Sequence, residues 1–368
     1  MSRLDELIAD LCPQGVEFEK IKDVYTRLKG TPITARKMKK IESPDGDIRI
    51  FAGGKTVINA MEEDIPNSNI TRVPAVLVQS RGAIDAIYYD EPFTFKNEMW
   101  AYTSKNKTSV KYLYYVLKNN IQQFRDVASG MGSLPQISLK VTEEFSIPVP
   151  PLPVQKEIVR ILDNFTELTA ELTAELTARK KQYEYYRDSL LTFGDEVDWK
   201  TLSDVLKIKN GKDYKQFKEG NIPVYGSGGI MTYIDTFVLD KPSVLIPRKG
   251  SVDKLYYVDV PFWTVDTIFY TEIYTNVVIP KFVFYYLQKE HLEQYNTAGG
   301  VPSLTQTVLN RITFPIPPLT EQQRIVDILN RFDTLCNDIS TGLPAEIEAR
   351  QKQYEYYRDK LLTFKELT

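Results

Sequence analysis

The chain contains one sixteen-residue block twice. Residues 178–193 read ARKKQYEYYRDSLLTF and residues 349–364 read ARQKQYEYYRDKLLTF, so fourteen of sixteen positions match at a separation of 171 residues. Weaker matches link other segments, such as VLVQSRGAIDAIYY at 76–89 with VLIPRKGSVDKLYY at 244–257. Agreement of this extent indicates a duplication, and a duplicated chain is expected to carry two related sites.

Each copy is expected to consist of an α/β (α+β) globular part followed by a long helix. Short β-branched and aromatic runs bounded by Gly and Pro predict strands in the globular parts, with one helix in each, at 110–124 and 280–295. Proline-rich joints at 148–153 and 315–319 end these parts. The predicted division is a globular part with an N-terminal helix at 1–150, a helix at 151–194, a second globular part at 195–317 and a second helix at 318–368.

The first long helix has an apolar stripe. Residues 154–193 contain no Pro or Gly, and apolar residues recur at spacings of three and four, which predicts a helix about 60 Å long. A stripe of that length needs a partner helix, and residues 321–364 are its counterpart. The first helix contains Glu-Leu-Thr-Ala three times at 167–178. The second lacks this tract, and Gly342-Leu343-Pro344 predicts a break or kink there.

Composition and cysteine content suggest a compartment. Hydrophobic residues make up 42% and charged residues 26% of the chain, values typical of soluble globular proteins. No apolar run approaches the length of a membrane span, and the N-terminus is acidic and amphipathic, unlike a signal peptide. Cys12 and Cys336 are too few for a disulfide framework, which predicts two thiols in a reducing compartment, the cytoplasm.

Basic residues are clustered although the net charge is −3, a value unlike that of a typical free-standing DNA-binding protein. Eight basic residues face three acidic ones in 27–55, and five face Asp213 alone in 207–218. A solvated lysine-rich loop explains either cluster by itself, but recurrence in both copies favours a functional surface. The candidate contacts in the clusters are Arg36, Lys37, Lys39 and Lys55, and Lys209, Lys212 and Lys215.

Binding residues also recur in loops of the two copies. Ser80-Arg81-Gly82 and Arg248-Lys249-Gly250 each follow an apolar strand, where a basic side chain can reach phosphate or guanine. Gly-rich segments precede Ser133 with Gln136 and Ser303 with Gln306, which we match in that order and which suit polar base edges. Turn formation and helix capping explain the same residue types without nucleic acid. The candidate contacts in the loops are Arg81, Ser133, Gln136, Arg248, Lys249, Ser303 and Gln306.

Residues suited to catalysis are scarce. The single histidine, His291, is expected to face solvent or the edge of the core and cannot supply a site in duplicate. No Cys or His pair has metal-ligand spacing, and GSGG at 226–229 and GGK at 53–55 fit neither a P-loop nor a dinucleotide fingerprint. We therefore expect a non-catalytic chain without a cofactor or metal.

The joints and the repeated blocks resemble those of a known family. IPVPPLPVQKEIVRILDNF at 147–165, FPIPPLTEQQRIVDILNRF at 314–332, the two KQYEYYRD blocks and IPVYGSGGI at 222–230 resemble the specificity subunit of type I restriction–modification systems. This resemblance covers essentially the whole chain and implies two target-recognition domains, each reading one half of a split double-stranded DNA site. It also implies two antiparallel coiled-coil spacer helices that hold these domains apart and dock two methyltransferase subunits.

In that family, S-adenosylmethionine chemistry belongs to the methyltransferase subunits and ATP-driven cleavage to a restriction (motor) subunit. Base-reading residues vary within the family, so the candidate contacts named above rest on loop chemistry alone.

Tyrosines crowd the ends of both long helices. They surround more than one face of each helix, whereas a two-helix seam needs a single stripe, so the remainder are expected to dock the methyltransferase. The candidate docking residues are Tyr183, Tyr185, Tyr186, Tyr354, Tyr356 and Tyr357. Two alternatives remain: a duplicated coiled-coil adaptor with no DNA-binding role and, less favoured, a nuclease or methyltransferase in its own right.

Overall fold

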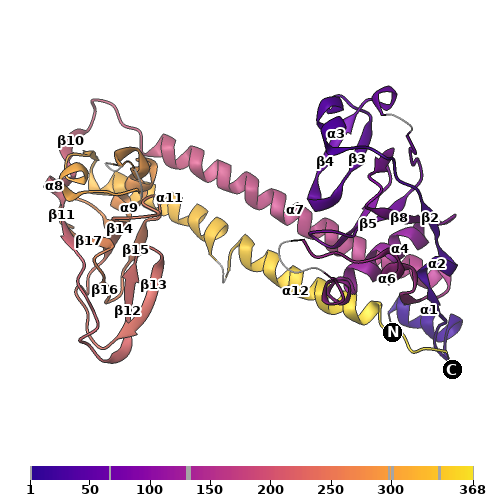
Figure 1. The fold of residues 1–368 in the computed structure, drawn as a ribbon. Coiled ribbons are helices and arrows are strands. Elements are labelled where there is room, and N and C mark those ends of the chain that lie inside the picture. Colours follow the sequence, from indigo (N-terminus) through magenta and orange to yellow (C-terminus); the bar gives the residue numbers. More distant parts are fainter. Residues whose placement is uncertain are drawn as a thin grey trace. The chain divides into compact units, whose positions relative to one another are not determined.

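The computed structural model describes residues 2–65, 68–129, 134–296, 299, 302–338 and 341–367. The chain forms two compact units (Figure 1). Unit 1 comprises Met1–Glu171 and Ile347–Thr368, and unit 2 comprises Leu172–Glu346. Helix α7 (Leu152–Leu190) is continuous for 39 residues, so its first half belongs to unit 1 and its second half to unit 2.

Unit 1 contains three small sheets. Four strands pair in the order β2-β8-β5-β6, three in the order β4-β3-β7, and β1 pairs with β9. The strands are β1 (Phe18–Lys20), β2 (Thr26–Leu28), β3 (Ile48–Phe51), β4 (Val57–Ala60), β5 (Ala75–Gln79), β6 (Asp85–Tyr89), β7 (Phe93–Phe95), β8 (Trp100–Thr103) and β9 (Ser146–Pro148). The helices are α1 (Arg3–Leu11), α2 (Ile21–Val24), α3 (Ala35–Ile41), η1 (Gly53–Lys55), η2 (Glu62–Asp64), α4 (Lys107–Asn119), α5 (Ile121–Asp126) and α6 (Leu139–Glu143), with most of α12 (Leu343–Leu361).

Unit 2 repeats this arrangement. Its strand orders are β11-β17-β14-β15, β13-β12-β16 and β10-β18. The strands are β10 (Asp198–Thr201), β11 (Leu206–Asn210), β12 (Glu219–Gly226), β13 (Gly229–Ile234), β14 (Ser243–Pro247), β15 (Tyr256–Val258), β16 (Trp263–Thr264), β17 (Ile268–Ile273) and β18 (Thr313–Ile316). The helices are α8 (Leu202–Val205), α9 (Pro280–Lys289), η3 (Leu292–Tyr295), α10 (Gln306–Leu309) and α11 (Leu319–Asn337).

The two units match strand for strand, which confirms the duplication predicted from the sequence. In each three-stranded sheet the middle strand pairs antiparallel with one neighbour and parallel with the other: β3 with β7, and β12 with β16. The Pro-rich joints begin in the short pairs β1–β9 and β10–β18, where Pro148 and Pro315 lie in two-stranded ladders. Proline is tolerated in these edge strands because it lacks only its backbone N–H, which in an edge strand can face solvent.

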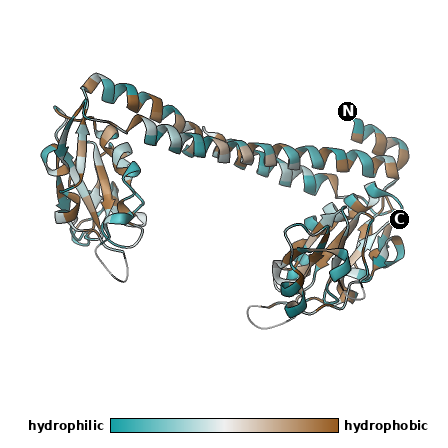
Figure 2. Cartoon of the chain, turned by 90° about the horizontal axis from the view of Figure 1, so that it is seen from above, coloured by the Kyte–Doolittle hydropathy of each residue, from teal (hydrophilic) through white to brown (hydrophobic). Residues whose placement is uncertain are grey.

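One helix fills the core of each unit. The buried face of α4, including Tyr112 and Leu113, packs against β5 and β6 and joins a cluster that contains Ile158 of α7. In unit 2 the buried face of α9, including Phe282, joins a cluster that contains Ile325 of α11. Hydrophobic residues concentrate inside the sheets in Figure 2, while the long helices alternate between hydrophilic and hydrophobic residues. No helix in the described part of the chain has the length and apolarity to cross a membrane.

The repeated blocks are exchanged between the copies. The block at 178–193 belongs to unit 2, where Leu191 is fully buried, and the block at 349–364 belongs to unit 1, where Leu362 takes the equivalent place. Ring stacking follows the same exchange. Phe165 stacks on Tyr357 in unit 1 at a centroid distance of 5.5 Å, and Phe332 stacks on Tyr186 in unit 2 at 5.4 Å. Each globular part is therefore completed by the helical end of the other copy.

Two predicted helices are shorter than the sequence suggested. The helix expected at 110–124 is divided into α4 and α5 at Asn120, whose side chain donates to the carbonyl oxygen of Val116. The helix expected at 280–295 ends at Lys289, because His291 adopts a left-handed backbone with φ of 46°. His291 is exposed, as expected, and its ring lies 3.5 Å from the Glu293 carboxylate.

The break expected in the second long helix is present. Helix α11 ends at Asn337 and α12 begins at Leu343. An added Cβ on Gly342 would lie 2.5 Å from the carbonyl oxygen of Thr334, so only glycine fits this close approach.

A buried glutamine ties α11 to its globular part. The Gln322 side chain is fully buried. It accepts a hydrogen bond from the backbone N–H of Ile279 (2.8 Å) and donates to the carbonyl oxygens of Pro317 (2.9 Å) and Val277 (3.2 Å). Three backbone groups at the joint therefore depend on one side chain.

Gln322→Ala is expected to lower the free energy of unfolding of unit 2 by about 1–3 kcal/mol, because it leaves buried backbone groups without partners. Chemical denaturation measures this loss. The matched control is Gln323→Ala, which removes an exposed glutamine whose side chain donates to Asp327 in the same helix. Equal stability of the two variants would contradict the role given to Gln322.

Candidate nucleic-acid interface

Three loops meet at one end of the sheets in unit 1. Residues Arg81 and Gln136 form an isolated β-bridge, and the backbone N–H of Gly82 donates to the carbonyl oxygen of Pro135 at 2.9 Å. An added Cβ on Gly82 would lie 3.7 Å from Gly54, so η1 belongs to the same group. We call residues 53–55, 80–82 and 134–136 the loop cluster of unit 1.

Unit 2 has an equivalent loop cluster, residues 227–228, 248–250 and 302–304. Lys249 and Ser303 form the bridge, and Gly250 N–H donates to the carbonyl oxygen of Pro302 at 3.1 Å. The β12–β13 turn is attached through Ser227, whose N–H donates to Thr267 Oγ1 at 3.3 Å. Gly82 and Gly250 have φ of 75° and 81°, a conformation that explains why a glycine follows the basic residue in both loops.

The structure corrects the match between the two copies in this region. Gln136 lies opposite the basic loop of unit 1 as Ser303 lies opposite that of unit 2. The buried residues that follow, Ile137 and Leu304, each donate a backbone N–H to the carbonyl oxygen at the strand end. Ser133 lies outside the described residues, and Gln306 begins α10, where Leu139 begins α6. The matched pattern is Pro-x-(Ile/Leu)-(Ser/Thr), a weaker signal than the shared Ser-Leu pair that guided the sequence alignment.

The basic loops differ by one residue in the position of arginine. Arg81 is exposed and matches exposed Lys249, whereas Arg248 matches Ser80, which is buried. The Arg248 guanidinium lies over the Phe269 ring at 5.7 Å and is half-buried. Arg248 is therefore held in place by this ring, a geometry that favours directional contact over a mobile point charge.

Polar partners hold some of the other candidates. Gln306 donates to the Asn210 side chain at 3.2 Å, next to the loop cluster of unit 2. Lys209 lies 3.7 Å from Glu272 on the neighbouring strand β17, so part of its charge is already paired. Lys212 and Lys215 are exposed in the segment before β12, and the N–H of Lys212 donates to the carbonyl oxygen of Thr264.

Four of the eight basic residues in the cluster at 27–55 lie on helix α3 and not in a loop. Met38 and Ile41 of α3 are buried against the three-stranded sheet, while Arg36 and Lys39 are exposed. Lys37 is half-buried, and its N–H donates to the capping Thr34. The sequence signal was the apolar spacing of three within this charged segment, together with a threonine at the capping position.

A cleft of about 530 Å³, lined by both polar and apolar residues, lies between α3 and the loop after β3. Its lining includes Lys39, Lys96 and Glu98, and the Lys96 ammonium lies 2.8 Å from the Glu98 carboxylate. Burial opposes ionisation of Glu98, but hydrogen bonds from Lys96 and the N–H of Gly53 lower the pKa of this carboxyl group below its usual value. Glu98 thus anchors the Gly53 loop as Thr267 anchors Ser227. The backbone of Lys55 belongs to this loop.

The six tyrosines divide into buried and exposed groups. Tyr183 is buried, packs near Phe332 and donates to Gln288, and half-buried Tyr354 packs against the core of unit 1. Tyr185 and Tyr356 are 69% and 63% exposed. Each forms an edge-to-face pair with its neighbour, Tyr186 or Tyr357, which stacks on the opposite long helix. The exposed tyrosines are therefore fixed platforms at matching places in the two units.

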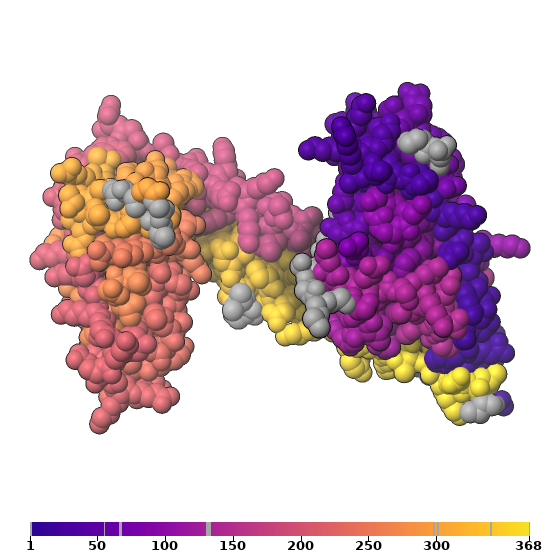
Figure 3. All heavy atoms as spheres, in the orientation of Figure 1, coloured from indigo at the N-terminus to yellow at the C-terminus, as the bar shows by residue number. Residues whose placement is uncertain are grey.

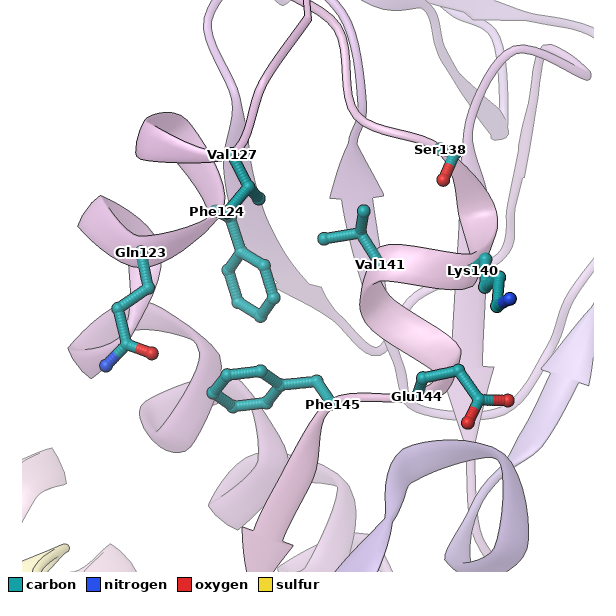
Figure 4. Close-up of a pocket in the computed structure, with 8 residues that line it drawn as sticks. All are labelled: Gln123, Phe124, Val127, Ser138, Lys140, Val141, Glu144 and Phe145. Atoms are coloured by element: carbon teal, nitrogen blue, oxygen red, sulfur yellow. The ribbon is translucent and has the colours of Figure 1, made fainter.

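An apolar cleft of about 440 Å³ lies between α5 and α6 (Figure 4). Phe124 and Phe145 face each other in it at a ring-centroid distance of 4.7 Å, and Glu144 lies at its edge. Hydrogen bonds from Lys20 and Lys22 lower the pKa of Glu144 to about 2, so this carboxylate is a poor general base. Among the described residues, no group of His, Cys, Asp and Glu has the arrangement of a metal site.

The fold of this chain is thus a duplication in which each of two matched units carries a basic loop cluster. The family model of the type I restriction modification DNA specificity domain matches residues 13–179 and 195–349. The specificity subunit of the EcoR124I/EcoR124II type I restriction enzyme of Escherichia coli is 40% identical over 294 residues, or 70% of this chain and 72% of that one. A putative type I specificity subunit of Haemophilus influenzae is 32% identical over 301 residues, or 74% and 77%.

Solved structures share the fold. The type I restriction–modification S subunit from M. genitalium has a TM-score of 0.67 at 19% identity, covering 95% of this chain and 96% of that one. A chain from a structure of type I restriction–modification complex assembly has a TM-score of 0.57 at 15% identity, covering 96% and 98%. The chain belongs to the family of type I restriction–modification specificity subunits. Its function is that of the non-catalytic DNA specificity subunit of such a system.

Proposed function

We propose that each unit reads one half of a bipartite double-stranded DNA site through its loop cluster. The observation that carries this proposal is the match between the two clusters: a basic residue, a left-handed glycine and a Pro-x-(Ile/Leu) segment at the same sheet end of both units. The contacts we propose are Arg81 and Gln136 in unit 1 and Arg248, Lys249 and Ser303 in unit 2. Gln306, Lys209, Lys212 and Lys215 flank the second cluster, and Arg36, Lys37 and Lys39 flank the first. Lys55, which belongs to the first cluster, is a further proposed contact.

In this proposal the target-recognition domains are residues 1–150 and 195–317, and the spacer helices are residues 151–194 and 318–368. Each repeated block completes the core of the other copy. A target-recognition domain is therefore complete only with the start of its own spacer helix and the end of the other copy's spacer helix. Half-length chains are thus expected to need a second copy for stability.

We further propose that two methyltransferase subunits dock on the spacer helices and that restriction (motor) subunits join them. The matched tyrosine platforms support two equivalent docking places. This complex would act in the cytoplasm, where its DNA target lies. Tyr183 is omitted from the docking surface because its side chain is used by the core of unit 2, and Tyr354 contributes mainly to the core of unit 1.

Replacing Tyr185 and Tyr356 together by serine is expected to weaken methyltransferase assembly at least tenfold, the effect of losing about 1.4 kcal/mol, and to leave the melting temperature within a few degrees. Both rings are mostly exposed, so the fold depends little on them. Size-exclusion chromatography with the purified partner measures assembly. Trp199→Ser, at another exposed aromatic residue, is the control. Assembly equal to wild type would remove these residues from the docking surface.

A direct test of the proposed function is a salt-dependent gel shift of the full chain with its methyltransferase partner. Binding to duplex DNA that weakens steeply with salt and prefers one bipartite sequence supports it. A complex that assembles but shows no sequence preference would favour the adaptor alternative.

A further inference from the structure

Strand β13, at the edge of the three-stranded sheet in unit 2, presents apolar side chains to solvent. Ile230 and Met231 of β13 are 50% and 58% exposed, and Tyr233 is 48% exposed, whereas Ile234, the next residue, is buried. The strand is otherwise well packed, because Ile234 joins a core cluster with Val224 of β12. A contiguous group of exposed apolar side chains on an ordered strand is typical of a binding surface.

This surface begins at the loop cluster. The ribbon of β12 and β13 ends in the pair Gly226–Gly229, directly before Ile230. Its turn is tied to the cluster by Ser227, which donates to Thr267, and the carbonyl oxygen of Thr267 accepts from the N–H of Arg248 at 2.9 Å. The ribbon, in the salmon colour range, forms the lower part of unit 2 on the face seen in Figure 3. The loop of Arg248 and the turn that precedes Ile230 are therefore joined through Thr267.

A bulge directs the two apolar side chains. Val224 pairs with Thr232 and Tyr225 pairs with Ile230, so Met231 is the extra residue of the ladder. Its side chain lies across Gly226, where an added Cβ would come within 2.6 Å of the Met231 sulfur. Bulges of this kind redirect side chains at the edges of sheets, and here neighbouring Ile230 and Met231 both remain exposed.

The equivalent strand of unit 1 lacks this feature. In β4, Ile58 and Ala60 are buried and Asn59 is polar, and the sheet is covered by α3. The segment before β12 forms no such helix; its Tyr214 and Phe217 pack on the ribbon's core instead. The exposed apolar strand is thus found in unit 2 and not at the equivalent strand of unit 1. Such a difference is expected if the two units read different half-site sequences.

We propose that the β12–β13 ribbon enters the major groove of the second half-site and that Ile230 and Met231 pack against thymine C5-methyl groups. This inference rests on the proposed reading of DNA by unit 2. The major groove admits a two-stranded β-ribbon, and the thymine methyl is the apolar feature of its floor. Exposed Lys249, in the loop beside the turn, supplies positive charge for the phosphates that line the groove.

Replacing thymine by deoxyuridine removes only the methyl group and so provides the test. The full chain, assembled with its methyltransferase subunit, is titrated with duplexes carrying deoxyuridine at each thymine of the second half-site. Wild type is expected to lose about 3- to 5-fold in affinity at one position or more, the effect of burying one methyl group. The variant Ile230→Ala with Met231→Ala is expected to bind thymine DNA correspondingly weakly and to be insensitive to deoxyuridine.

Controls separate this contact from general damage. Val260→Ala shortens an equally exposed apolar residue in the loop after β15 and should keep the full methyl effect. Met231→Leu preserves apolar volume and should largely restore affinity. Deoxyuridine in the first half-site should affect wild type and the double variant alike, and thermal unfolding of all variants should match wild type.

Three results would overturn the proposal. In the first, the double variant binds thymine DNA and deoxyuridine DNA more weakly than wild type by the same factor. In the second, the double variant loses methyltransferase assembly but keeps the wild-type methyl effect. In the third, the second half-site consists only of G·C pairs. Failure of the proposed function itself is distinguishable, because the wild-type complex would then bind its site no better than random DNA.

Discussion

Insertion of one further Glu-Leu-Thr-Ala unit into α7 is expected to widen the gap between the two half-sites by one base pair, or at most about two. Four added residues lengthen a helix by about 6 Å, and the rise of DNA is about 3.4 Å per base pair. The half-sites themselves should stay the same, because the loop clusters lie outside the tract. Affinity for the original spacing should fall, since a rigid reader depends on half-site separation.

The structure favours this outcome because the tract at 167–178 lies inside one uninterrupted helix. The opposing segment is not continuous: α11 ends at Asn337 and α12 begins at Leu343, which leaves a joint that can absorb a change in length. Each added unit also rotates a straight helix by about 40°, a rotation shared between the partner helix and DNA twist. Sequencing of modified sites checks the gap, with Glu171→Gln as a control of unchanged length. An unchanged gap, or altered half-site bases, would rule out the tract as a ruler.

Arg248→Ala is expected to relax base preference in one half-site only, at a cost of about 1–3 kcal/mol. Its guanidinium is held over Phe269 beside the ribbon turn, so its loss removes a directional contact. Arg81→Ala changes the exposed arginine of the corresponding loop in unit 1, which aligns with Lys249, and is expected to affect the other half-site. Binding of both variants to libraries randomised in each half-site measures the effect.

The salt dependence of binding distinguishes base contact from phosphate contact. If Arg248 only touched a phosphate, all sequences would weaken together and the salt slope would fall by about one. A change of base preference in both half-sites after a single substitution would contradict independent reading by the two units.

Much of this architecture was predictable from local sequence patterns. The repeated blocks, the proline joints and Gly342-Leu343-Pro344 each act through short-range chemistry, and the structure contains the corresponding duplication, strand ends and helix break. The continuous helix α7 likewise follows from the absence of Pro and Gly in 154–193.

Features that depend on tertiary packing were missed. Nothing local indicates that Leu191 completes the second core and Leu362 the first, because the blocks are nearly identical in sequence. Burial of Tyr183 follows from that exchange. The repeats were also aligned wrongly at Gln136, since the bridge to the basic loop, and not the nearest Ser-Leu pair, fixes the correspondence. The apolar spacing of α3 was hidden within a strongly charged segment.

The proposed function requires that this specificity subunit reads two half-sites with two independent units. The most direct measurement is methylation-sensitive sequencing of DNA from cells that contain the chain and its methyltransferase partner, before and after residues 195–317 are exchanged for those of a relative. We expect two specified blocks separated by an unspecified gap, with only one block changed by the exchange. A single continuous motif, or an exchange that alters both blocks, would contradict it.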